Sequence, residues 1–136
     1  MSAYIPDKLR QFVWQRAAGR CEYCRLPETD ANHKHEPDHI IPRQHDGETT
    51  TANLALTCWR CNRHKGTNLG SFDPATRAFS LFFNPRTQVW EEHFRLEGAL
   101  LQPLTPEARV TARILRFNDS LRVAERGALL RMGLYG

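Results

Sequence analysis

The segment that decides the fold runs from Glu36 to Gly66 and reads EPDHIIPRQHDGETTTANLALTCWRCNRHKG. It places carboxylates, imidazoles, carboxamides and thiols beside two short apolar runs, at residues 39–41 and 53–58. Apolar runs of this length, bounded by proline and polar residues, are typical of β-strands. The stretch from Trp59 to a glycine at position 66 is typical of a helix. We therefore expect a strand–strand–helix unit with a polar loop around Gly47.

The four cysteines of the chain form two Cys-x-x-Cys pairs. Cys21 and Cys24 precede this segment, and Cys58 and Cys61 lie near its C-terminal end. A redox pair is the alternative, but neither pair is surrounded by the βαβ pattern that such motifs require. In a reducing compartment this spacing favours a tetrahedral Zn²⁺ site over disulfides. Four thiolates fill the coordination shell of the ion, so we expect structural zinc and place any catalysis on other residues.

Length and composition predict one domain, and the expected helices and strands place it in the α+β class. The chain has 136 residues, of which 25% are charged and 40% hydrophobic, as in ordinary globular proteins. We expect a core at 21–66 and an extension at 70–136 packed on it. No apolar run approaches the roughly 20 residues of a membrane span, and the N-terminus lacks a secretory signal. These features predict a cytoplasmic protein, and the net charge of +4 admits a polyanionic partner.

The flanking regions predict further helices and strands. Before the core, residues 6–20 predict a helix whose buried face contains Leu9, Phe12, Val13 and Ala17. After it, residues 72–83 predict a turn and a strand, and two short strands are expected on either side of Gly98. Thr105 is expected to cap a helix, followed by a second helical piece at about 120–132. The periodic apolar positions there are Val110, Ile114, Phe117 and Leu121.

Chemically competent side chains gather around the predicted hairpin. Asp38 suits a hard cation such as Mg²⁺, and a neutral imidazole at His39 suits a general base near pH 7. Asn53 opens the second strand, where its amide oxygen can orient that imidazole. Asn62 follows Cys61 directly and can offer a carbonyl oxygen to a metal.

The ordered set CEYC, DHIIP, Gly47, NLALTC, CN and HKG resembles the HNH endonucleases, a branch of the His-Me-finger or ββα-metal nucleases. The resemblance covers residues 21–66, and the tail is similar to that of a common bacterial group within the family. It implies that His39 is the general base and that Asp38 and Asn62 bind one catalytic Mg²⁺, Mn²⁺ or Ni²⁺. It also implies that Asn53 orients the base and braces the loop, with His64 as a fallback ligand in place of Asn62. The implied reaction is hydrolysis of DNA phosphodiester bonds to 5′-phosphate and 3′-hydroxyl ends.

Several basic residues are candidates for phosphate contacts. Near the expected cleft these are Arg43, Arg63 and Lys65, the last on the same helical face as Asn62. A second series in the tail comprises Arg109, Arg113, Arg116, Arg122 and Arg126. That series predicts either a DNA-backbone surface or a solvated helix face.

One position departs from the family pattern. Pro37 precedes the Asp-His pair, and proline lacks the N–H that a central strand needs. The first strand must therefore start late or lie at a sheet edge.

Two other functions compete with nuclease activity. Zinc deaminases need a His-x-Glu and a Pro-Cys-x-x-Cys signature, and this chain has neither, because Thr57 stands where the proline should be. A non-catalytic zinc-stapled nucleic-acid-binding module is the stronger alternative. It has no need of a base beside a carboxylate, whereas Asp38, His39, Asn53 and Asn62 are all present. The expected partner is DNA, with no membrane and no small-molecule substrate.

Overall fold

The computed structural model describes residues 4–135, and the chain divides after Leu69 into two compact units. Helices combine with three separate two-stranded antiparallel sheets, which confirms the α+β class. Within the described residues, no helix has both the length and the apolar character needed to cross a bilayer. The packing of the second unit on the first stays a prediction.

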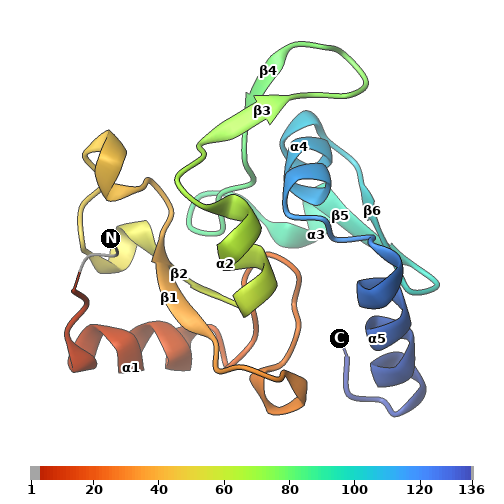
Figure 1. The fold of residues 1–136 in the computed structure, drawn as a ribbon, viewed down its shortest axis with the longest axis horizontal. Coiled ribbons are helices and arrows are strands. Elements are labelled where there is room, and N and C mark those ends of the chain that lie inside the picture. Colours follow the sequence, from red (N-terminus) through yellow and green to blue (C-terminus); the bar gives the residue numbers. More distant parts are fainter. Residues whose placement is uncertain (1–3, 136) are drawn as a thin grey trace. The chain divides into compact units, whose positions relative to one another are not determined.

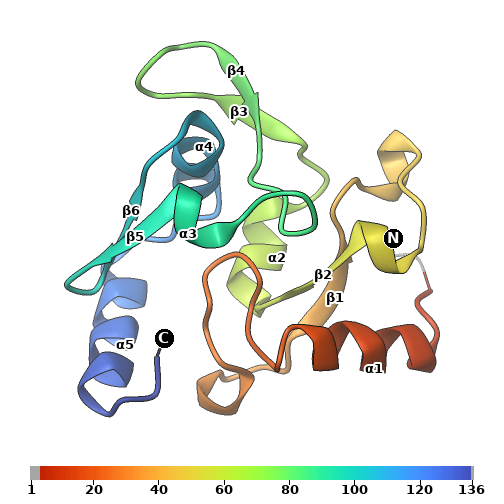
Figure 2. The ribbon, with the colours of Figure 1, turned by 180° about the vertical axis from the view of Figure 1, so that it is seen from behind.

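The first unit contains the predicted strand–strand–helix core. The strands β1 (Glu36–His39) and β2 (Leu54–Thr57) pair antiparallel, and helix α2 (Trp59–Lys65) follows at once, as Figures 1 and 2 show from opposite sides. Helix α1 (Asp7–Arg16) precedes them. The connections contain the short 3₁₀ helices η1 (Glu28–Asp30), η2 (Arg43–His45) and η3 (Thr51–Asn53).

Strand β1 begins earlier than predicted. Pro37 lies inside it, opposite Leu56, whereas we expected the strand at residues 39–41. The late start was wrong, and the edge position is confirmed, because each strand of a two-stranded sheet has one free edge. At such an edge the missing N–H of a proline removes no ladder hydrogen bond.

Helix α1 contributes to a small apolar core. Val13 is fully buried and packs in one cluster with Ile5, Leu54 and Leu56, against which Leu9 and Ala17 are partly buried. Phe12 was predicted on the same face but is 47% exposed, with the guanidinium of Arg16 5.2 Å from its ring. The helix itself ends at Arg16, earlier than the predicted range.

The second unit is built from two hairpins and three helices. The hairpins are β3 (Gly70–Phe72) with β4 (Phe79–Leu81), and β5 (Phe94–Glu97) with β6 (Leu100–Pro103). The helices are α3 (Trp90–His93), α4 (Pro106–Ile114) and α5 (Ser120–Arg131). Thr105 caps α4 as predicted, since its side chain accepts a hydrogen bond from the Ala108 amide. Strand β3 and helix α3 were not predicted.

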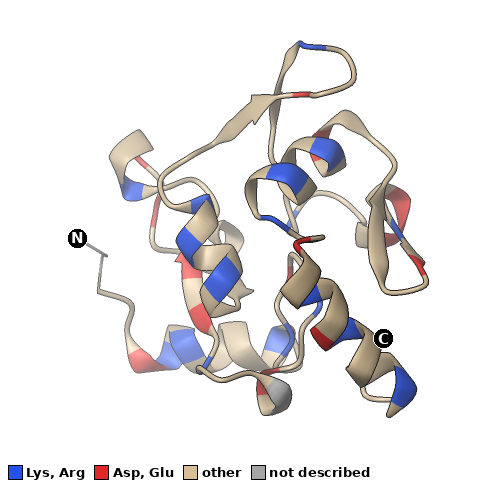
Figure 3. Cartoon of the chain, turned by 45° about the vertical axis from the view of Figure 1, so that its right-hand side comes forward, with Lys and Arg blue, Asp and Glu red and all other residues tan. Residues whose placement is uncertain are grey.

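The tail arginines do not form one surface. Arg122 and Arg126 are 5% and 4% exposed, and both donate to backbone carbonyls around the break between α4 and α5. Arg109 forms an ion pair with Asp73, at 2.8 Å. The DNA-backbone reading is therefore wrong for these three side chains. Figure 3 shows how Lys and Arg are distributed along the chain, α4 and α5 included. The apolar series is confirmed only in part: Val110 and Phe117 are fully buried, but Phe117 lies between the helices and Leu121 is 66% exposed.

Candidate active site

The two cysteine pairs meet in one buried cluster. The sulfur atoms of Cys21, Cys24, Cys58 and Cys61 all lie within 4.8 Å of one another. Those of Cys24 and Cys58 are 3.7 Å apart. Four sulfurs at about 2.3 Å from a tetrahedral zinc are separated by roughly 3.8 Å, so the spacing fits that ion.

The surroundings of the sulfurs also fit a cation. Backbone amides of Cys24 and Cys61 point at the sulfurs of Cys21 and Cys58, at 3.5 and 3.4 Å. Burial raises the pKa of the Cys21 and Cys61 thiols well above the ordinary value. A bound Zn²⁺ reverses that shift, because it stabilises thiolates directly. The cluster ties the segment after α1 to the start of α2, as a structural zinc site would.

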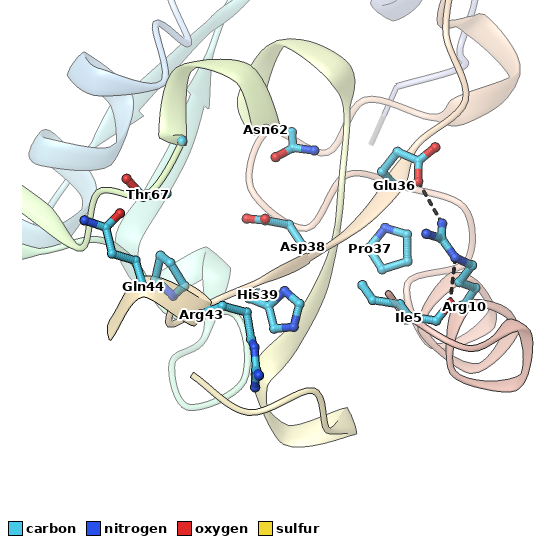
Figure 4. Close-up of a pocket in the computed structure, with 12 residues that line it drawn as sticks. Ile5, Arg10, Glu36, Pro37, Asp38, His39, Arg43, Gln44, Asn62 and Thr67 are labelled. Atoms are coloured by element: carbon cyan, nitrogen blue, oxygen red, sulfur yellow. Dashed lines mark hydrogen bonds and ion pairs between the residues drawn. The ribbon is translucent and has the colours of Figure 1, made fainter. Parts of the chain in front are cut away.

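A pocket in the first unit brings most of the predicted catalytic residues together. Asp38 and His39 at the end of β1, Asn62 on α2 and Arg43 of η2 all line it. Figure 4 shows the carboxamide of Asn62 directed toward the carboxylate of Asp38, one from the helix and the other from the strand. Adjacent strand residues normally face opposite sides. His39 is the last residue of β1, which allows both side chains to border one pocket.

The environment of His39 suits a general base. Its side chain is largely buried, at 7% residue exposure, and its Nε2 atom shares a 2.8 Å hydrogen bond with the hydroxyl of Thr49. Burial lowers the pKa of His39; the negative charge of Asp38 opposes this shift, and the positive charges of Arg43 and Lys65 add to it. Since the ordinary pKa of histidine is about 6.5, the imidazole is neutral at pH 7.

Asn53 braces the loop but does not touch the imidazole. Its Oδ1 atom accepts a hydrogen bond from the Ile41 amide, and its Nδ2 atom donates to the carbonyls of Ile41 and Glu48. Direct orientation of His39 by this amide was predicted wrongly, and the hydroxyl of Thr49 occupies that place. The loop can close this tightly because residue 47 is glycine: a β-carbon there would overlap the Ile41 carbonyl and lie 2.9 Å from Asn53 Nδ2.

Lys65 is a second correction. It was predicted to meet a substrate phosphate, but its residue is 1% exposed and its ammonium is turned into the protein. Nζ donates to Asp38 Oδ2 and to the His39 carbonyl, both at 2.9 Å. An ammonium group held in this way pairs with the Asp38 carboxylate inside the protein and is not presented to a ligand.

The other predicted residues separate into two groups. Arg43 lines the pocket and donates to the Gly47 carbonyl at 3.1 Å, so it remains a candidate for phosphate. Arg63 and His64 are not among the residues that line the pocket. The guanidinium of Arg63 lies 5.2 Å from the Trp59 ring, on the exposed side of α2.

The donor set of the pocket fits a hard divalent cation. The carboxylate of Asp38 uses Oδ2 for Lys65, and Oδ1 is the oxygen left for a metal. The carboxamide oxygen of Asn62 is a second hard donor that lines the pocket, and hydrated Mg²⁺ commonly uses only one or two protein ligands of this kind.

Sequence reasoning did not identify the role of Thr49. It is one of three consecutive threonines, and no spacing rule distinguishes the one whose hydroxyl reaches His39. The only available signal was its position in the loop between the two motif strands.

Comparison with known proteins gives residues 21–68 the same family assignment as the sequence motifs. Residues 21–68 match the sequence model of the family described as HNH endonuclease. The chain is also 47% identical over 96 residues to the CRISPR-associated endonuclease Cas9 of Corynebacterium diphtheriae. That alignment covers 70% of this chain and 7% of the Cas9 protein. No solved structure gives a significant match.

Proposed function

Because residues 21–68 form an HNH endonuclease domain, we propose that this protein is a metal-dependent endonuclease that hydrolyses DNA phosphodiester bonds. The observation that carries the proposal is the pocket in which Asp38, His39 and Asn62 meet, with a neutral imidazole beside a carboxylate. DNA is proposed as the substrate from the family and from the Cas9 relative.

In the proposed reaction His39 takes a proton from the attacking water. When Nε2 carries a proton and donates it to Thr49, Nδ1 is left with the lone pair that accepts the second proton. The water oxygen forms a bond to phosphorus as the bond to the 3′ oxygen breaks. The 3′ oxygen leaves with the bonding electron pair and takes a proton from solvent, which gives 5′-phosphate and 3′-hydroxyl ends. Asp38 and Asn62 would hold a divalent cation, whose chemistry when bound would be to neutralise charge at the phosphate and the leaving oxygen.

The cations follow from the two donor sets. Zn²⁺ fits the four thiols, and Mg²⁺, or Mn²⁺ or Ni²⁺ in its place, is proposed for the oxygen ligands of the pocket. Four buried cysteines grouped as zinc ligands also favour a reducing, cytoplasmic setting.

A plasmid-nicking assay with Mg²⁺, Mn²⁺ or Ni²⁺ tests the proposal. Loss of the general base in His39→Ala is expected to lower the cleavage rate about 10²–10⁴-fold, with zinc content and circular dichroism unchanged. Asp38→Ala is expected to lose at least as much. His33→Ala is the matched control, because this exposed imidazole stacks on Trp59 and does not line the pocket.

The alternative function is a zinc-stapled nucleic-acid-binding module that does not cut. A gel-shift measurement run alongside the nicking assay separates the two. DNA binding with no metal-dependent cleavage, or cleavage that His39→Ala leaves intact, contradicts the nuclease proposal.

A further inference from the structure

The pocket proposed to hold the catalytic cation has an unusual charge balance for a metal site. The acidic side chains that line it are Glu36 and Asp38, and each already forms an ion pair with a basic side chain. Glu36 is bound by Arg10 at 2.8 Å, and Asp38 by Lys65 at 2.9 Å. The cation would therefore meet carboxylates whose charge is already offset.

The formal charges make this explicit. Arg10, Arg43 and Lys65 contribute +3, and the two carboxylates contribute −2, which gives +1 with His39 neutral. The oxygen donor from α2, the carboxamide of Asn62, carries no charge. The affinity of a hard cation rises with the charge of its ligands, so this set alone predicts weak binding.

Lys65 cannot leave when a cation arrives. Its residue is 1% exposed, and Nζ is bonded to both Asp38 and the His39 carbonyl. Turning it away would leave an ammonium buried without its counter-charge, which is strongly unfavourable. The side chain of Asp38, in contrast, is 19% exposed and can turn its free oxygen toward the pocket.

We propose that Lys65 acts as a fixed internal counter-charge, so that the catalytic cation binds tightly only together with a phosphate of the nucleic acid. This inference rests on the proposed function and adds an order of assembly to it. The positive charge of Lys65 offsets the negative charge of Asp38, and the phosphodiester supplies the negative charge that the cation then lacks. By linkage, the cation strengthens DNA binding by the same factor.

The first test measures Mn²⁺ affinity by electron paramagnetic resonance, in the zinc-loaded full chain. His39→Ala serves as the parent, because it keeps both proposed oxygen ligands and should leave a short duplex uncut. We expect the duplex to tighten Mn²⁺ binding on the order of tenfold, within the roughly 5–150-fold range typical of coupled sites. The double variant with Asp38→Ala gives the blank for Mn²⁺ held by DNA alone.

The second test removes the counter-charge. Lys65→Met in the same parent keeps most of the buried stem and frees both oxygens of Asp38. Mn²⁺ binding without DNA should tighten about tenfold, and the further gain from DNA should shrink accordingly. Lys8→Met is the matched control, because this exposed lysine of α1 does not line the pocket, and it should leave the DNA-free affinity unchanged.

Two results would overturn the inference: Mn²⁺ affinity that is the same with and without duplex, or Lys65→Met that leaves DNA-free affinity unchanged or weaker. Should Lys65→Met not fold, Lys65→Gln makes the same charge change with a polar group near the His39 carbonyl, and the first test stands without either variant. Wild-type nicking is a separate readout. A chain that cuts DNA without this coupling refutes only the role of Lys65, whereas a chain that never cuts refutes the nuclease.

Discussion

The two units are stabilised by different chemistry. The first contains all four cysteines, whose buried sulfurs lie within 4.8 Å of one another, and its apolar cluster is small. The second contains no cysteine and buries four phenylalanines; the ring centroid of Phe94 lies 5.5 Å from those of Phe83 and Phe117. There, buried guanidinium groups bond directly to backbone carbonyls.

The difference shows which unit can leave polar side chains in a pocket and which unit needs them for its own internal hydrogen bonds. A zinc ion on the four sulfurs would supply much of the stability of the first unit, and Asp38, His39 and Asn62 line a pocket there. In the second unit the polar groups of Arg122, Arg126 and Asp73 are turned inward onto the protein itself. The first unit is therefore suited to chemistry, and the second to stability that needs no metal.

The largest effect is expected from loss of zinc. Structural zinc sites contribute about 10–16 kcal/mol of apparent binding free energy at pH 7, so Cys61→Ser or a strong chelator should unfold the first unit. Hydrogen exchange read by mass spectrometry should show lost protection before residue 69 and retained protection after residue 70. Equal loss in both halves would break the comparison.

Removal of a buried guanidinium should destabilise the second unit and leave the first unit intact. Arg126 donates to the carbonyls of Ala99 and Phe117, both at 2.8 Å. Arg126→Met leaves both acceptors unpaired and should cost about 2–4 kcal/mol, with loss of exchange protection confined to the second unit. Arg113→Met, at an exposed position of α4, should stay within about 0.5 kcal/mol in the same urea titration.

The Asp73–Arg109 pair gives the second unit a distinctive response to acid. The guanidinium of Arg109 holds the pKa of Asp73 well below its usual range. A depressed carboxyl pKa contributes stability that is present above about pH 4 and is lost as pH falls toward the folded value.

Asp73→Asn should therefore lower the free energy of unfolding at pH 7. It should also reduce the slope of that free energy against pH in acid, by an amount that corresponds to up to roughly one bound proton. Urea titrations at several values between about pH 2 and pH 7 measure this. If the free energies of unfolding of wild type and variant change in parallel with pH, the Asp73–Arg109 pair does not give the second unit its own response to acid.

The smallest effect on stability is expected at Thr49, where the first unit uses a polar contact for chemistry. Thr49→Val removes the hydroxyl bonded to His39 and should lower kcat about tenfold, or about 1.4 kcal/mol of barrier, with KM nearly unchanged. Thr49→Ser should restore the rate. Loss of stability without loss of rate would assign Thr49 to the scaffold.

The sequence predicted the parts that depend on spacing. Cysteine spacing predicted the cluster, and the order of Asp38, His39 and Asn62 predicted a shared pocket. It did not predict the inward turn of Lys65 and Arg126, because long basic side chains are normally exposed and only tertiary contacts bury them. Strand β1 was misplaced for a similar reason: the meaning of Pro37 depends on how many strands the sheet has.

The close approach at Gly47 has a consequence for mutational screens. No side chain at this position lines the pocket, and yet any β-carbon would push apart the Ile41 carbonyl and the carboxamide of Asn53. The 41–48 loop that these groups close leads directly into Thr49, whose hydroxyl shares a hydrogen bond with His39. A saturation library scored by DNA cutting would thus rank position 47 among the most intolerant, although the residue performs no chemistry and merely leaves room.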